Sequence, residues 1–180
     1  MTRSRRALVA LAVAVLAAVA VLALILVLAS RDSGGVAAVR GPGALQPDHG
    51  HRRLPASAPA RAASPPADPP TSGSFHKTVL DQDRTRLSDD ELLTALSNGN
   101  IVLAYGAAQP PAALRRLQRA TAGKYDPFLE GAGQAVILAR RPGVSGVVAL
   151  AWRRLLRVTD PTDPRLRDFI DAWLGQGPLA

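Results

Sequence analysis

Apolar residues are concentrated in one unbroken run near the start of the chain and in several short segments further on. Residues 7–29 contain no charged or polar side chain. As a helix, this run would rise about 35 Å, and a hydrocarbon core is about 30 Å thick. The alternative is a cleaved signal peptide, but its apolar region usually spans only about 7–15 residues and ends at an A-x-A site. We therefore predict an uncleaved transmembrane helix over residues 7–29.

The charges that flank this run predict its orientation. Three arginines precede it, whereas Arg31 and Asp32 cancel each other directly after it. Because positive charge is retained on the cytoplasmic side, we expect residues 1–6 in the cytoplasm and everything after Ser30 outside. The chain is rich in Ala, Arg, Pro and Gly, which suggests a GC-rich bacterial genome. The prediction is a single-pass protein of a bacterial cell membrane, with the lipid bilayer as a partner through residues 7–29.

The pattern changes after the apolar run. Residues 31–73 hold eight of the chain's fifteen prolines and no aromatic residue, and apolar positions recur there with neither helical nor strand spacing. Such a segment cannot bury enough apolar surface to offset its ordering entropy, so we expect residues 30–73 to be a disordered linker. His49 and His51 have a chelating spacing, but a metal site needs three or four ligands held by structure. We interpret both as solvated linker residues.

Residues 74–180 alternate between apolar runs and helical periodicity, which predicts an extracytoplasmic globular domain. Strands are expected over residues 75–80, 101–105, 134–140 and 146–158. Ser88-Asp89-Asp90-Glu91 is a capping box, which predicts a helix that ends near Gly99. Two more helices are expected over residues 112–122 and 163–174; in the last, apolar residues recur at i, i+3, i+4, i+7 and i+8.

These elements give the order β-α-β-α-β-β-α. Strands separated by helices favour parallel pairing, and turn residues at 141–145 predict a hairpin between the last two strands. The expected fold class is therefore α/β (α+β), a small mixed sheet with helices packed on it. The same order occurs in thioredoxin-like folds. A redox pair would there follow residues 101–105, but this sequence reads Gly-Ala-Ala-Gln-Pro-Pro at that position.

Net charge does not point to nucleic acid. The formal charge of +8 divides into +3 for residues 1–30, +2 for residues 31–73 and +3 for residues 74–180. Much of the excess thus lies in the anchor and linker, and weak attraction to anionic lipid explains the basic bias more simply than nucleic acid does. Arg115, Arg116 and Arg119 share one helix face, which is either solvated or a docking patch for an acidic partner or lipid.

Candidate chemistry is sparse. The chain has no cysteine, which excludes disulfides and thiol chemistry. Gly131-Ala132-Gly133 precedes a predicted strand, whereas a phosphate loop must precede a helix. The only histidine in residues 74–180 is His76, without an evident acid partner, so serine hydrolysis is unsupported. We expect no catalytic residue, cofactor or metal ligand.

Several short strings together resemble a known family. In chain order they are Pro69-Pro70-Thr71-Ser72-Gly73 followed by His76, Leu96-x-x-Gly99-x-Ile101-Val102-Leu103-x-Tyr105, Ala151-Trp152-Arg153, Phe169-Ile170, and Gly175-Gln176-Gly177-Pro178. Their order and spacing are similar to those of the bacterial membrane-anchored family of unknown function numbered 3105, over residues 69–178.

The resemblance implies a polar site, from which this chain departs. The family pattern reads P-P-T-S-G-P-H and S-L-E-H-G, which implies two histidines and a carboxylate brought together. Here Ser74 and Phe75 replace the proline before His76, and Ser97-Asn98 replace the Glu-His pair. We expect a site built on that pair to be absent, or reduced to a structural hydrogen bond of Asn98. The candidate residues that the resemblance carries over are His76, Asn98, Tyr105 and Trp152.

The favoured functional hypothesis is a non-enzymatic interaction module of the cell envelope, which binds an unknown protein, an envelope component or a lipid surface. The alternative is a metal-binding or metal-dependent envelope protein, and a hydrolase is the least supported class.

Overall fold

The computed structural model describes residues 41–59, 63–65 and 67–178. One compact unit begins at Pro42. The predicted cytoplasmic end, residues 1–6, and the predicted transmembrane helix, residues 7–29, lie outside the described residues. Among the helices that are described, none is long and apolar enough to cross a membrane.

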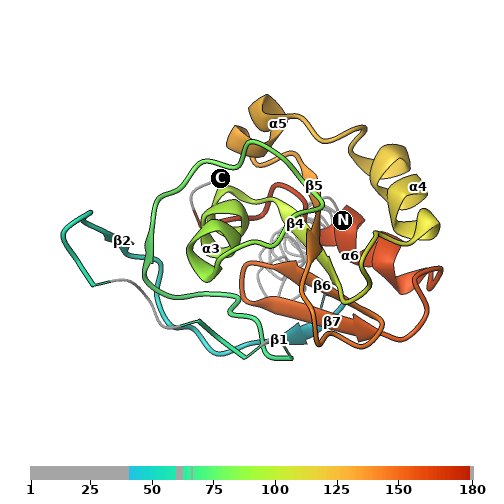
Figure 1. Cartoon of the computed structure of the whole chain (residues 1–180), viewed down its shortest axis with the longest axis horizontal. Coiled ribbons are helices and arrows are strands. Elements are labelled where there is room, and N and C mark those ends of the chain that lie inside the picture. The colour runs from blue at the N-terminus through green and yellow to red at the C-terminus, as the bar shows by residue number, and fades with distance from the viewer. Residues whose placement is uncertain (1–40, 60–62, 66, 179–180) are drawn as a thin grey trace, which may run out of the picture. The chain divides into compact units, whose positions relative to one another are not determined.

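The centre of this unit is a five-stranded mixed sheet (Figure 1). Its strand order is β1-β7-β6-β4-β5. Strands β4 and β5 are parallel, and the other neighbours are antiparallel. The strands span Ala44–Leu45 (β1), Ile101–Tyr105 (β4), Val136–Arg140 (β5), Val147–Ala151 (β6) and Arg154–Val158 (β7). The predicted mixed sheet with helices is confirmed, as is parallel pairing across a helical connection.

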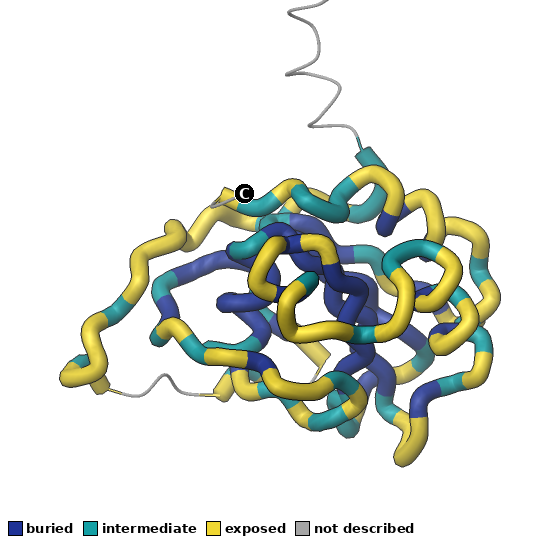
Figure 2. Tube along the Cα trace, turned by 90° about the horizontal axis from the view of Figure 1, so that it is seen from above, coloured by how far each residue is buried: buried dark blue, intermediate teal, exposed yellow. Residues whose placement is uncertain are grey.

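Helices cover both faces of the sheet. Helix α3 (Asp89–Asn98) packs on the face that carries Val102 and Leu150. Helices α4 (Ala112–Thr121) and α6 (Arg165–Trp173) pack on the other face, against Ile101 and Leu103. The buried residues therefore form two clusters, one on each side of the sheet. Figure 2 shows that the buried positions lie in the interior of the trace. A five-residue helix, α5 (Pro127–Gly131), which the sequence pattern did not predict, lies between α4 and β5.

The capping box predicted at the start of α3 is confirmed. The Ser88 hydroxyl accepts a hydrogen bond from the Glu91 N–H, and the Glu91 carboxylate accepts one from the Ser88 N–H at 2.7 Å. At the other end, Gly99 has a φ of 107°, which is a left-handed conformation that glycine adopts without a Cβ penalty. Local sequence signals therefore fix both ends of this helix.

The predicted hairpin between residues 134–140 and 146–158 is wrong, because β4 lies between β5 and β6. Residues 146–158 form two strands instead of one, and Trp152-Arg153 is the turn that joins them. Arg153 has a φ of 57°, which a residue with a Cβ adopts only at a cost. Its N–H donates to the Thr71 carbonyl, and its carbonyl accepts from the Gln46 N–H. These contacts with distant residues hold a turn that no local glycine marks.

The strand predicted over residues 75–80 is shorter than expected and does not belong to the main sheet. Strand β3 spans only Phe75–His76 and pairs in parallel with β2 (Arg53–Leu54), in a separate two-stranded sheet. Further along the chain, the segment around Arg84 and Thr85 runs beside the outer edge of β5. There the Arg84 N–H donates to the Leu138 carbonyl, and the Thr85 carbonyl accepts from the Arg140 N–H. This segment satisfies backbone groups that an open sheet edge would leave unpaired.

The largest departure from the sequence interpretation is the segment of residues 42–73, which we call the strap. Its expected disorder is wrong for the described residues from Gly41 onward. The strap contributes β1 to the main sheet and β2 to the small one, and Pro69, Thr71 and Ser72 are buried. The apolar residues of the strap recur with neither helical nor strand spacing. That pattern showed only that the strap cannot form a hydrophobic core by itself. Its order comes from hydrogen bonds to the rest of the domain.

Donor groups of the domain hold the strap at several points. The Trp173 indole N–H donates to the Pro42 carbonyl at 2.8 Å. An Arg141 Nη2 donates to the carbonyls of Ser64 and Pro65, each at 3.1 Å. A proline-rich chain offers carbonyl acceptors but few N–H donors. The domain supplies the missing donors, so the two surfaces are complementary.

Candidate functional site

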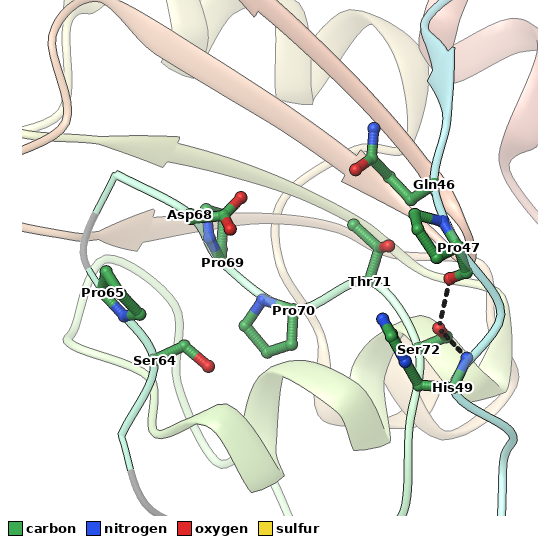
Figure 3. Close-up of a pocket in the computed structure, with 10 residues that line it drawn as sticks. All are labelled: Gln46, Pro47, His49, Ser64, Pro65, Asp68, Pro69, Pro70, Thr71 and Ser72. Atoms are coloured by element: carbon green, nitrogen blue, oxygen red, sulfur yellow. Dashed lines mark hydrogen bonds between the residues drawn. The ribbon is translucent and has the colours of Figure 1, made fainter.

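A pocket of about 340 Å³ lies within the strap (Figure 3). Three stretches of the strap form its walls, and one of them holds the proline-threonine-serine part of the string quoted from the sequence. The lining residues are Gln46, Pro47, His49, Ser64, Pro65, Asp68, Pro69, Pro70, Thr71 and Ser72. The pocket therefore exists only because the strap is ordered.

Ser72 joins two of these stretches. Its hydroxyl donates to the Pro47 carbonyl and accepts from the His49 N–H, both at 3.0 Å, as the dashed lines in Figure 3 show. Next to it, the Gly73 N–H donates to the Gly50 carbonyl at 2.7 Å. Ser72 is fully buried, and its proton is committed to a carbonyl. Ser72 therefore links the two stretches by hydrogen bonds. It is not an activated nucleophile, because that role needs an adjacent base.

The walls of the pocket are rich in proline and hold few ionisable groups. Four of the ten lining residues are prolines, which have a carbonyl but no N–H. The Ser64 N–H is already bound to Asp89. The lining residues with an ionisable side chain are His49 and Asp68; Asp68 is exposed and lies 3.8 Å from an Arg157 nitrogen. The Asp68 carboxylate is thus the charged acceptor that the pocket offers to a ligand.

An ion pair beneath the pocket holds the Ser64 wall. Asp89, in the first turn of α3, lies 3.2 Å from Arg141 Nη1, and its other oxygen accepts from the Ser64 N–H. Burial alone would raise the pKa of Asp89, but the hydrogen bonds from Ser64 and Arg141 outweigh burial and lower the pKa below its usual 3.8. Asp89 is therefore ionised at neutral pH and holds the strap and Arg141 together.

Two of the four candidates from the family resemblance lie at opposite ends of α3. His76 Nδ1 is 3.0 Å from an oxygen of Asp90, and the His76 N–H donates to the other oxygen of Asp90. Asn98 instead donates to Glu130 at 3.3 Å. Positions 90 and 98 are eight residues apart on the helix, or about 12 Å. His76 and Asn98 do not form one site, and Asn98 makes a hydrogen bond of the structural kind expected.

The other two candidates lie apart from both. Tyr105 is fully buried at the end of β4, and its hydroxyl donates to the Arg84 carbonyl at 3.4 Å. Burial, with the Asp83 charge, raises the pKa of the Tyr105 phenol. Trp152 is half-buried in the β6–β7 turn, against the core beneath α3. In the described structure no hydrogen bond joins any two of the four, and none of them lines the pocket.

The residues that do line the pocket were largely missed from sequence. His49 was interpreted as a solvated linker residue, and Gln46, Ser64 and Asp68 were not singled out. The available signal was the string at residues 69–73, which was quoted for the resemblance alone. For metals, the described residues contain no group of three or more His, Cys, Asp or Glu that could hold an ion.

Comparison with known proteins gives one match. A family model described as "Protein of unknown function (DUF3105)" matches residues 60–179, which include the second half of the strap and the domain after it. Neither the curated proteins nor the solved structures gave a match.

Proposed function

The chain belongs to the DUF3105 family of unknown function, so family membership assigns no activity. From the geometry we propose that the chain is a non-enzymatic binding module. The observation that carries this proposal is the pocket within the strap. It is a defined cavity of about 340 Å³, a size within the range of small-molecule and side-chain sites. Part of its wall is the string Pro69-Pro70-Thr71-Ser72.

The chemistry of the walls favours a cationic donor group as the ligand, such as an ammonium or a guanidinium. The Thr71 hydroxyl and the Asp68 carboxylate can accept hydrogen bonds. The carbonyls of Pro47 and Pro65 are already bound within the domain. The Asp68 charge would oppose an anionic ligand. A basic side chain of a partner protein, or an amine of an envelope component, fits these groups best.

Three features support binding rather than catalysis. The Ser72 proton is committed to the Pro47 carbonyl. The two ionisable lining residues, His49 and Asp68, are fewer than the three ligands that a catalytic metal needs. The chain contains no cysteine. A metal-dependent envelope protein stays the alternative hypothesis, and zinc titration of the full chain followed by calorimetry would test it.

The proposal includes the location expected from the sequence, with residues 7–29 as a single-pass anchor, the N-terminus in the cytoplasm and the domain outside. It also includes a thioredoxin-like arrangement without redox chemistry. The run β4-α4-α5-β5-β6-β7-α6 supports that arrangement. Both remain proposals about this chain.

The test uses small probes on the full chain in detergent micelles. Methylguanidinium and butylammonium are titrated while amide resonances are followed, with acetate as the anionic comparison. Binding should shift the amides of His49, Thr71 and Gly73, and Asp68→Asn should weaken it severalfold. Asp171→Asn, a change on the exposed surface of α6, is the matched control. Shifts of equal size with acetate, or shifts confined to residues outside the strap, would contradict the proposal.

A further inference from the structure

The outer face of α4 carries exposed positive charge. Arg115, Arg116 and Arg119 are all exposed, and α4 contains no acidic residue. In the part of the chain that the structure describes, no ion pair joins these three arginines to a carboxylate. By contrast, Arg165 and Arg167 on α6 pair with Asp163 and Asp171. Among the described residues, the positive charge on α4 is therefore not neutralised by a neighbouring carboxylate.

Beside these arginines lies a shallow, mainly apolar cavity between α4 and the start of α6. It has a volume of about 370 Å³, and its apolar lining includes Leu117, Ala120, Pro161 and Pro164. Arg116 lies at its border. We call the three arginines of α4 together with this cavity the α4 surface. Guanidinium groups next to exposed apolar groups are suited to a membrane interface, where phosphates lie above acyl chains.

The described chain starts on the same side of the sheet. The Trp173 indole, at the end of α6, donates to the Pro42 carbonyl, and Gly43 packs against the Phe169 ring. Helices α4 and α6 share the core on this face of the sheet. Residues 30–41, which separate Pro42 from the predicted anchor, can extend at most about 40 Å. An anchor at residues 7–29 would therefore keep the bilayer within about 40 Å of Pro42.

We propose that the α4 surface docks on the anionic phospholipids of the membrane that holds the anchor. This inference rests on the proposed anchor and goes beyond the proposed pocket. Each arginine can form paired hydrogen bonds with a lipid phosphate. The competing occupant is an acidic protein. Lipid is favoured because the connection at Pro42 keeps the bilayer within reach.

The chain has no cysteine, so a single introduced cysteine labels one site. The full chain is reconstituted into vesicles with a polarity-sensitive dye at Ala120→Cys, on α4, or at Ser57→Cys, near β2, as the control. Figure 1 shows α4 and β2 at opposite ends of the domain. Vesicles contain brominated lipid as a quencher, with phosphatidylcholine alone or with about one third phosphatidylglycerol. Either orientation of the anchor leaves the dye beside a leaflet of the same composition.

Docking predicts at least twofold stronger quenching at position 120 than at position 57, in the anionic vesicles only. The triple change Arg115→Gln, Arg116→Gln and Arg119→Gln, or 0.5 M salt, should abolish the difference, since salt screens exposed charges. Arg52→Gln with Arg53→Gln is the control for loss of positive charge elsewhere. Equal quenching at both positions overturns the inference. An unquenched label at position 120 also overturns it, and leaves the surface to an acidic protein. Failure of the chain to float with vesicles refutes the anchor instead.

Discussion

Two buried carboxyl groups of this domain lie in contrasting surroundings. Asp89 receives hydrogen bonds from Ser64 and Arg141, and the pKa of its carboxyl is lowered. For Glu130, burial outweighs the hydrogen bond from Asn98 and the charge of Lys77, so the pKa is raised above its usual 4.5. The same side-chain chemistry thus stabilises the fold at one position and opposes it at the other. The two groups should therefore give the domain opposite pH dependences.

Glu130→Gln should raise the stability at neutral pH. A carboxyl whose pKa is raised in the folded state loses stabilisation as pH rises from 4.5 through the folded pKa. Glutamine carries no charge but still offers an oxygen to Asn98 and Asn100, which donate to Glu130 Oε1. Urea denaturation at pH 7 should give a higher midpoint for the variant, and the difference should vanish below about pH 4. A lower midpoint at pH 7 would mean that the charge itself is needed.

Asp89→Asn should weaken the hold on the strap. A carboxyl with a lowered pKa contributes stability that is present above 3.8 and is lost as pH falls through its folded pKa. Asparagine can still accept from Ser64, but it leaves the charge of Arg141 without its carboxylate. We expect a loss of about 2 kcal/mol at neutral pH, less than for a fully buried pair. Trypsin should then cut at Arg52 or Arg53 faster than in Asp81→Asn, an exposed control.

At the scale of elements, sequence predicted what local signals determine. The capping box at Ser88 and the apolar run at Ile101–Tyr105 gave α3 and β4 within a residue or two of their observed bounds. The neighbours of each strand were predicted less well. The expected hairpin would make β5 and β6 neighbours, but β4 lies between them, and the local sequence pattern does not show which strands pair. The turn at Trp152-Arg153 was missed for a related reason. Its support comes from Thr71 and Gln46, both far away in the chain.

The β6–β7 turn makes a prediction about conformation. Arg153 has a φ of 57°, where glycine is unstrained and a β-branched residue is strongly disfavoured. Its Nε is also buried, without a partner among the described residues. Arg153→Gly should therefore match or exceed the stability of the natural chain, and Arg153→Val should be lower than Arg153→Gly by about 2 kcal/mol. Thermal denaturation of both variants measures this gap. Asp48→Asn is the control for loss of the Asp48 ion pair, which is half exposed and therefore worth little.

At the scale of the whole molecule, the candidate site was the part least accessible from sequence. The string at residues 69–73 was recognised, but the pocket was not, because the strap has no periodicity from which its position could be inferred. A pocket lined mainly by prolines and small polar residues has few side chains whose chemistry would mark it in the sequence. The four residues carried over from the resemblance are dispersed. Three of them have separate hydrogen-bond partners, and Trp152 packs against the core. What sequence lacked was the pairing of the strap with the domain.

The pairing of the strap with the domain determines which way the pocket would face if the domain docks on a membrane. Ser64, on the pocket wall, is bound to Asp89 of α3, and α3 covers the face of the sheet opposite to α4 and α6. Docking through the α4 surface would therefore leave the Ser64 wall of the pocket directed away from the bilayer. The connection between the proposed anchor and the compact unit is residues 30–41, which is shorter than the expected 30–73. It limits the distance between the bilayer and Pro42 to about 40 Å. The proposed module would bind partners close to its own membrane.

The domain boundary gives the last prediction. Residues 74–180 were the expected globular domain, whereas the compact unit begins at Pro42. Removing the strap takes away the acceptors of the Trp173 indole, of Arg141 Nη2 and of the Arg153 N–H. It also removes strand β2, which pairs with β3 at the fully buried Phe75. Each unpaired donor costs about 1–3 kcal/mol where it stays buried, and a domain is stable by only about 5–15 kcal/mol.

A fragment of residues 41–180 should therefore unfold cooperatively in urea, and one of residues 74–180 should be marginal or unfolded. Circular dichroism and amide hydrogen exchange on both fragments decide the matter. Adding a peptide of residues 41–73 to the shorter fragment should restore part of the protection, since the strap is held by contacts that do not need a covalent connection. If both fragments show the same midpoint, the strap does not contribute to folding, and the pocket would then have to be held by ligand alone.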